Sequence, residues 1–176
     1  RLTLLRREAG ITRWAEEYET FEQFYEAYKK WISFHIKVMA EQERMEYDFA
    51  GEVCGLSYLS MLYDDCMERG KGIFAGGIKY LGGTVETYGN INTADSLTAI
   101  KETVYDKKLL TPAGLLTALD ADFEGFDKEK RLLESVPKYG NDDSKADDMA
   151  MKVHEHICST VRNEIDRVKL HSYLVV

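Results

Sequence analysis

A thiol and a carboxylate lie close together in the sequence at Cys66-Met67-Glu68. This pair has the residue types of a nucleophile or a radical-forming thiol with a neighbouring acid. Residues two apart on a helix do not face each other, so the two groups would need a loop to act together. The helical spacing of Leu59, Leu62 and Cys66 predicts instead that the thiol lies on an apolar helix face. A buried structural cysteine is therefore the favoured reading.

Two further groups have the side chains of a metal site but not its spacing. His154, Glu155 and His156 are consecutive, whereas two helical metal ligands need a separation of three or four residues. This pattern predicts a solvated helix face. The second group is acidic and could chelate calcium, but capping of a helix explains it with less effort. Its members are Asn141, Asp142, Asp143 and Asp147.

The segment 64–97 organises the rest of the chain, because it carries seven of the thirteen glycines. Glycine at this density marks backbone with positive φ or with a very close neighbour. The spacing fits neither Gly-x-x-x-x-Gly-Lys-Ser/Thr nor a Gly-x-Gly-x-x-Gly that opens a helix, so a phosphate cradle is disfavoured. Strand-forming residues separate the glycines. We expect a helix to end here, extended chain to cross crowded space, and a second helix to begin.

Polar side chains among these glycines are the candidate site of the sequence. Two readings stay open for them: they line a cavity, or they make turn hydrogen bonds. No residue is assigned to catalysis, to a cofactor or to a metal. The candidate cavity-lining residues are Tyr80, Thr84, Tyr88, Asn90 and Asn92.

Apolar periodicity predicts the helices that position this segment. A long aromatic-striped helix follows a Thr20 cap to about Glu46, with Val38 and Met39 on its inner stripe; Gly51 and Gly55 interrupt the chain after it. The other predicted helices are 56–69 with Gly70 at its end, 92–107, one that starts at Thr111-Pro112 and stops by Gly125, 127–136, and 142–169. Extended chain is predicted within 76–90 and at 171–176. The expected fold is mainly α with a few β-strands.

Composition excludes several classes of protein. The chain has 23 basic and 31 acidic side chains, a net charge of −8, which argues against nucleic acid as a partner. No apolar run approaches the ~20 residues of a membrane span, and the first residues lack a signal-peptide core. Three cysteines without metal spacing, Cys54, Cys66 and Cys158, predict free thiols in a reducing, cytoplasmic setting. The chain begins at Arg1 and ends in an apolar run, so both ends look cut.

Several motifs in order give the chain a family resemblance. They are Leu-Ser-Met-Leu-Tyr-Asp-Asp-Cys-Met-Glu-Arg-Gly-Lys (59–71), Gly-Gly-Ile-Lys-Tyr (76–80), Asn-Ile-Asn-Thr-Ala-Asp-Ser-Leu-Thr-Ala-Ile-Lys (90–101), Asp-Phe-Glu-Gly (122–125) and Pro-Lys-Tyr-Gly-Asn-Asp-Asp (137–143). The series resembles glycyl radical enzymes of the pyruvate formate-lyase superfamily, in their dehydratase and decarboxylase branch. The segment 81–88 departs from the Asn-Phe-Thr-Gly-Pro-Gln-like run of many relatives, which leaves the substrate branch open.

The resemblance implies that residues 1–176 are part of a pyruvate formate-lyase-like domain, within a ten-stranded α/β barrel that encloses the active site. Whole members are several-fold longer. They carry a thiyl-forming Gly-Cys-x-Glu loop upstream and a radical glycine in Arg-Val-x-Gly-Tyr downstream, and neither motif occurs here. Cys66 follows Asp65 rather than glycine, so it does not take the thiyl role.

The resulting hypothesis is a fragment of an anaerobic glycyl radical lyase, catalytically incomplete by itself. As the resemblance implies, the parent enzyme would be a homodimer and would act on a small organic substrate through a thiyl radical. A separate activase with S-adenosylmethionine and an iron–sulfur cluster would install the glycyl radical. The alternative is a non-catalytic, mainly helical protein-interaction module. The expected partners are the rest of the parent chain and the activase, with no nucleic acid and no membrane.

Overall fold

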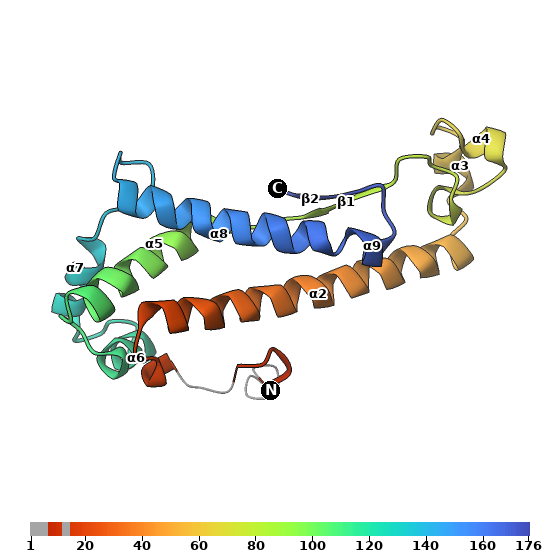
Figure 1. Cartoon of the computed structure of the whole chain (residues 1–176). Helices are drawn as coiled ribbons and strands as arrows, with labels where there is room; N and C mark the ends of the chain where they lie inside the picture. The colour runs from red at the N-terminus through yellow and green to blue at the C-terminus, as the bar shows by residue number, and fades with distance from the viewer. Residues whose placement is uncertain (1–6, 12–14) are drawn as a thin grey trace. The chain divides into compact units, whose positions relative to one another are not determined.

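A computed structural model describes residues 7–11 and 15–176 of the chain. The elements in chain order, coloured from red to blue in Figure 1, are η1 (Ala15–Glu17), α2 (Phe21–Val53), α3 (Ser57–Ser60), α4 (Cys66–Arg69), η2 (Ile73–Ala75), β1 (Gly82–Val85), α5 (Asn90–Ile100), η3 (Lys101–Asp106), α6 (Pro112–Asp120), α7 (Asp127–Glu134), α8 (Ser144–Asn163), α9 (Ile165–Val168) and β2 (Ser172–Val175). The prediction of a mainly helical chain with few strands is confirmed. Two compact units make up the chain: residues 1–32 with 88–156, and residues 33–87 with 157–176.

The described part of unit 1, which comprises residues 7–11, 15–32 and 88–156, contains helices and turns. Phe21, at the start of α2, is 6% exposed; its ring stacks on Tyr25 at 5.9 Å and meets Tyr105 edge-on at 6.0 Å between centroids. The predicted start of α6 is confirmed: Thr111 Oγ1 accepts a hydrogen bond from the Gly114 amide at 3.0 Å, and Pro112 opens the helix. Aromatic packing therefore stabilises the start of α2, and a side-chain cap stabilises the start of α6.

The predicted helix 92–107 begins earlier and changes its type. Gly89, at φ 82°, is the N-cap of α5, so the helix starts at Asn90 rather than after Asn92 or Thr93. At Lys101 the α-helix gives way to the π-helix η3. Glu102 in η3 is 9% exposed and forms ion pairs with Lys107 Nζ at 2.5 Å and with Lys145 Nζ at 3.3 Å. The two lysines together neutralise a carboxylate that would otherwise be an unpaired buried charge.

Unit 2, residues 33–87 and 157–176, holds both strands and the short helices α3, α4 and α9. Its buried apolar side chains come from the later part of α2, from the glycine-rich segment and from the C-terminal residues. They are Ile36, Ala40, Cys66, Ile73, Val85, Ile157, Val161, Val168, Leu170 and Tyr173.

Gly51 does not interrupt the first long helix, which was predicted to end near Glu46. It lies inside α2, and a Cβ on Gly51 would come within 2.8 Å of the Phe74 carbonyl oxygen. The glycine serves close packing against segment 73–75 rather than chain reversal. The prediction that the apolar stripe of this helix is buried is also wrong for its last residues. Val38 and Met39 are 48% and 44% exposed.

The predicted helix 56–69 is wrong. The chain forms two separate turns, α3 and α4, and both Leu56 and Asp65 have positive φ, at 37° and 72°. Positive φ cannot continue a right-handed helix, so the turns break at these residues. Of the predicted inner face Cys66 is buried, but Leu62 and Met67 are 66% and 68% exposed.

The predicted last helix divides as well: α8 ends at Asn163 and α9 follows it. Asp143 caps α8 as expected, since its Oδ1 accepts from the Lys145 amide at 2.9 Å. No helix among the described residues is both long and apolar enough to cross a membrane.

Candidate functional site

The two strands of unit 2 form a parallel pair whose partner residues are 90 positions apart in the sequence. Gly82, Gly83, Thr84 and Val85 stand opposite Ser172, Tyr173, Leu174 and Val175. Backbone hydrogen bonds extend the pairing to His171 with Leu81 at 2.8 Å and to Thr87 with Val176 at 2.9 Å. In the described part of the chain each strand pairs only with the other. Parallel strands normally occur in larger sheets covered on both faces, so this pair has the form of one section of such a sheet.

A carboxylate from α2 lies against one face of this pair. An ideal Cβ built on Gly83 would come within 2.4 Å of Glu43 Oε1, so only glycine leaves room for that carboxylate. Burial raises the pKa of both Tyr173 and Tyr47, and the charged, hydrogen-bonding carboxylate of Glu43 raises both further. Glu43 thus joins α2 to β2 through acceptor oxygens shared by two phenols.

A small polar hollow of about 200 Å³ opens beside this cluster. Carboxylate, amide, phenol and hydroxyl groups surround it, together with one thioether. The lining residues are Met39, Gln42, Glu43, Glu46, Tyr47, Thr84 and Tyr173.

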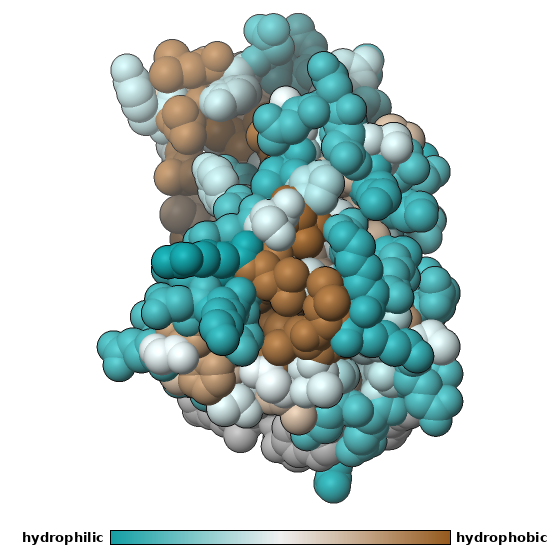
Figure 2. Space-filling model, turned by 90° about the vertical axis from the view of Figure 1, so that its left-hand side faces the viewer, coloured by the Kyte–Doolittle hydropathy of each residue, from teal (hydrophilic) through white to brown (hydrophobic). Residues whose placement is uncertain are grey.

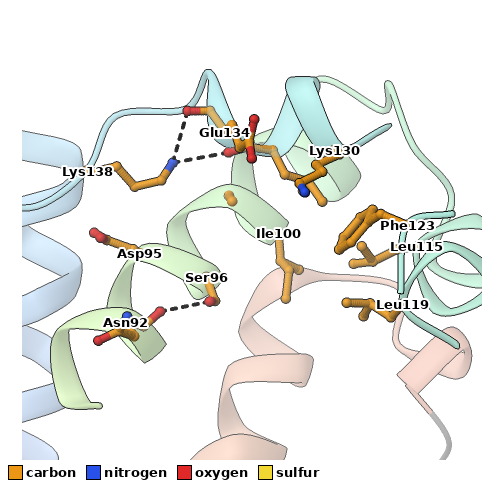
Figure 3. Close-up of a pocket in the computed structure, with 12 residues that line it drawn as sticks. Asn92, Asp95, Ser96, Ile100, Leu115, Leu119, Phe123, Lys130, Glu134 and Lys138 are labelled. Atoms are coloured by element: carbon orange, nitrogen blue, oxygen red, sulfur yellow. Dashed lines mark hydrogen bonds between the residues drawn. The ribbon is translucent and has the colours of Figure 1, made fainter. Parts of the chain in front are cut away.

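Unit 1 has a larger hollow, of about 530 Å³, between α5, α6 and α7. Its floor is apolar: Ile100, Leu115, Leu119 and Phe123 point toward one another in Figure 3. Figure 2 shows this side of unit 1 as a hydrophobic recess bordered by hydrophilic side chains. An apolar floor with a polar rim is the usual composition of a binding hollow.

The motif that starts at Pro137 contributes Lys138 to the polar rim of the unit 1 hollow. Lys138 Nζ donates to the carbonyl oxygens of Leu133 at 3.1 Å and Glu134 at 3.5 Å (Figure 3). It also donates to the carbonyl oxygen of Val136 at 2.5 Å, and these bonds close the C-terminal end of α7. Asp95 Oδ1 on α5 accepts from the Tyr139 amide at 2.8 Å. The Asp95 carboxylate therefore holds the α7–α8 connection onto α5 through the Tyr139 amide, and Lys138 has a structural role at the end of α7.

The five predicted cavity residues fall in different surroundings. Thr84 borders the hollow of unit 2, and Asn92 borders the hollow of unit 1. The Tyr80 ring lies 4.6 Å from the His171 ring between centroids, the Tyr88 side chain is 91% exposed, and Asn90 is the first residue of α5. The five belong to two units, and their joint role in one cavity stays a prediction.

Cys66 is a buried structural thiol, as predicted, although the helix on which the prediction rested does not form. It is 2% exposed, and its Sγ would lie 2.8 Å from a Cβ on Gly77. All three cysteines are free thiols. A sulfur packed against backbone in this way has no room for a substrate, so Cys66 does not fit the role of a thiyl radical.

The histidine group is solvated only in part. His154 and Glu155 are exposed, but His156 is half-buried with Nε2 at 3.2 Å from the Lys29 carbonyl oxygen, and burial lowers its pKa. Within residues 7–11 and 15–176, no cluster of three or more His, Cys, Asp or Glu side chains is arranged to hold a metal ion.

Sequence reasoning missed Glu43, Tyr47 and Tyr173 as one cluster. Glu43 and Tyr47 are four residues apart, which places them on one helix face, and this spacing could have been noticed. The distance of 126 positions from Tyr47 to Tyr173 carries no signal in a single sequence.

Comparison with known proteins identifies a family and several proteins of similar sequence. The family described as pyruvate formate lyase-like matches residues 7–170. Trans-4-hydroxy-L-proline dehydratase of Clostridioides difficile is 35% identical over 137 residues, covering 77% of this chain and 17% of the relative. The glycyl radical subunit of 4-hydroxyphenylacetate decarboxylase, from the same species, is 29% identical over 170 residues, covering 83% of this chain and 19% of the relative.

A solved structure shows the same arrangement of elements. The crystal structure of hydroxyproline dehydratase from Clostridioides difficile, with trans-4-hydroxy-L-proline bound, superposes with a TM-score of 0.82 at 32% identity. The match covers 91% of this chain and 20% of that chain. The present chain therefore spans about a fifth of the length of the proteins it matches.

Proposed function

This chain belongs to the pyruvate formate lyase-like family, and we propose that it is a segment of a longer glycyl radical lyase. The observation that carries the proposal is the family match over residues 7–170, with relatives that include a dehydratase and a decarboxylase glycyl radical subunit. The proposed parent abstracts hydrogen from a small organic substrate through a thiyl radical. It then eliminates water, an amine or carbon dioxide, or cleaves a carbon–carbon bond.

This segment contributes structural elements, rather than reactive groups, to the proposed enzyme. A two-stranded parallel sheet is not stable alone, and its outer edges offer unpaired backbone groups to further strands. We propose that β1 and β2 belong to a ten-stranded α/β barrel completed by the rest of the parent chain. Tight packing of helices and strands then shields the radical from water. The candidate cavity residues Tyr80, Thr84, Tyr88, Asn90 and Asn92 are proposed to contribute to the chamber inside.

The reactive groups of the proposed enzyme lie outside these 176 residues. The sequence has neither the Gly-Cys-x-Glu loop nor the Arg-Val-x-Gly-Tyr loop. Cys66 packs directly against Gly77, so a substrate cannot reach its sulfur. Accordingly we assign no catalytic step to a side chain of this segment. The radical would be installed by an S-adenosylmethionine iron–sulfur activase, and we further propose a cytoplasmic homodimer as the parent.

The gene on both sides of the segment tests this proposal. The expected reading frame continues in both directions, with Gly-Cys-x-Glu upstream of Arg1 and Arg-Val-x-Gly-Tyr downstream of Val176. A reading frame that ends without encoding either loop would contradict the proposal of an enzyme segment and favour the alternative function.

That alternative is a non-catalytic helical interaction module, and exposed apolar side chains are the observation that favours it. Tyr58, Leu62 and Met67 are 73%, 66% and 68% exposed, as expected of a surface that another protein covers. The unfinished sheet favours the enzyme segment, because an independent module should protect its strand edges.

A further inference from the structure

Three of the five sequence motifs described above meet at the hollow of unit 1. Asp95 and Ile100 belong to the motif 90–101, Phe123 belongs to the motif 122–125, and Lys138 belongs to the motif 137–143. These motifs are separate in the sequence, and the fold brings them to one place. The hollow is therefore a feature that the motifs build together.

The aromatic part of the floor is held in an unusual backbone conformation. Asp122 and Phe123 both have positive φ, at 49° and 61°. A bulky side chain rarely adopts this left-handed conformation, and the surrounding structure must supply the free energy that it costs. The result is a Phe123 ring that lies beside Leu115 and Leu119 of α6 (Figure 3). Backbone strain of this kind is concentrated at binding and active sites.

A second irregularity borders the same floor. Ile100, which also lines the hollow, is the last residue of α5, and the π-helix η3 begins directly after it at Lys101. Turns of π-helix are rare and frequently occur at functional sites. Two departures from regular backbone at one floor favour a binding hollow over a simple gap in packing.

The rim carries two charges of opposite sign that other side chains do not neutralise. Lys130 and Glu134 lie one turn apart on α7, and both border the hollow (Figure 3). Among the residues that the structure describes, neither the Lys130 ammonium nor the Glu134 carboxylate forms an ion pair. The other two rim charges are engaged, because Asp95 accepts from the Tyr139 amide and Lys138 donates to main-chain oxygens.

We propose that the unit 1 hollow binds a free α-amino acid with a large apolar side chain. The ligand's side chain packs against the Phe123 ring and the aliphatic floor, its carboxylate pairs with Lys130 Nζ, and its ammonium group pairs with the Glu134 carboxylate. The volume of about 530 Å³ lies within the range of small-molecule sites. The inference concerns binding alone and does not depend on the proposed radical chemistry.

Isothermal titration calorimetry of the intact, unactivated parent protein with L-phenylalanine tests the proposal. Two analogues each lack one charge: 3-phenylpropionate has no ammonium group, and 2-phenylethylamine has no carboxylate. The test variants are Lys130→Met and Glu134→Gln. Lys128→Met, at an exposed position of α7 that does not line the hollow, is the matched control. Circular dichroism checks that each variant is folded.

L-Phenylalanine is expected to bind with a dissociation constant below about 1 mM, and each analogue at least about fivefold more weakly. Lys130→Met should weaken binding of L-phenylalanine and 3-phenylpropionate by at least about fivefold and leave 2-phenylethylamine unchanged, because only a carboxylate pairs with this lysine. Glu134→Gln should weaken L-phenylalanine and 2-phenylethylamine instead. Lys128→Met should bind all three compounds like the wild-type protein.

Three results would overturn the inference. The first is no measurable binding of L-phenylalanine at millimolar concentration. The second is binding that Lys130→Met and Glu134→Gln both leave unchanged, because the ligand would then lie elsewhere in the parent protein. The third is an analogue that binds as tightly as L-phenylalanine, since the hollow would then not recognise both charges of an amino acid.

Failure of the proposed function has a separate signature. A parent protein that binds L-phenylalanine as expected but forms no organic radical with its activase keeps this site and is not a glycyl radical enzyme. A parent protein that forms the radical but does not bind L-phenylalanine retains the proposed function and loses this site.

Discussion

The carboxylate of Glu43 occupies the space that a side chain on Gly83 would need. A Cβ at Gly83 would meet Glu43 Oε1 at 2.4 Å and Leu170 Cδ1 at 2.7 Å. This relationship brings α2, β1 and Leu170, two residues before β2, into contact within unit 2. It also explains why a glycine lies in the middle of a strand, where glycine otherwise weakens the structure.

Gly83→Ala should therefore lower the free energy of unfolding by about 1–3 kcal/mol, because a methyl group would push Glu43 away from its tyrosine partners. Gly55→Ala is the control, since a Cβ there meets only Ser57 Oγ at 3.7 Å. Urea unfolding followed by circular dichroism measures both variants. Equal stability of the two would show that Glu43 moves aside without cost.

The start of α6 depends on one hydroxyl. Thr111→Ala removes the acceptor of the Gly114 amide and should cost about 1 kcal/mol of stability, whereas Thr111→Ser keeps it and should cost less. Chemical denaturation of both variants gives the comparison. A serine variant as unstable as the alanine variant would point to lost methyl packing instead of a lost cap.

Lys138 closes the end of α7 with hydrogen bonds to main-chain oxygens. Lys138→Met should lower stability by about 1–2 kcal/mol, because partly buried carbonyl groups lose a charged donor. Lys128→Met, at an exposed position on the same helix, should change stability little. Hydrogen exchange should show the loss of protection at residues 133–139, and uniform loss over the whole chain would contradict a local role.

Alkaline pH should destabilise unit 1 through Tyr28. Burial, with Tyr25 beside it, raises the pKa of Tyr28 from 10.0 to about 12. The unfolded chain therefore releases this proton first, and the stabilisation present below pH 10 is lost as the pH rises toward 12. Tyr28→Phe should flatten the dependence of unfolding free energy on pH in this range, while Tyr88→Phe, at a 91% exposed ring, is the control. Identical pH profiles for the wild-type protein and Tyr28→Phe would contradict this assignment.

Local signals in the sequence were sufficient for much of the fold. The Thr111-Pro112 start and the cap at Asp143 follow from residue type and short spacing, and the structure confirms them. The burial of Cys66 is also confirmed, although the helix from which it was predicted does not form. The failures come from long-range packing. Gly51 looked like a breaker because its neighbour Phe74 is remote in sequence.

The candidate site was less predictable, because its partners come from distant parts of the chain. Thr84 was selected as a polar residue among glycines, but its pairing with Leu174 depends on a strand register that no local pattern encodes. The region 56–69 shows a second limit. Its apolar residues have helical spacing, yet the positive φ of Asp65 separates the two turns α3 and α4, and Leu62 between them is exposed.

Electron paramagnetic resonance of the intact parent protein is the most direct test of its assignment as a glycyl radical lyase. The full reading frame that contains this segment would be incubated without oxygen with its S-adenosylmethionine activase, reductant and S-adenosylmethionine. A stable organic radical signal is predicted, with loss of signal when the glycine of the downstream Arg-Val-x-Gly-Tyr loop is replaced by alanine. A fully folded protein that forms no radical under these conditions, or forms one unaffected by the glycine replacement, would contradict the account.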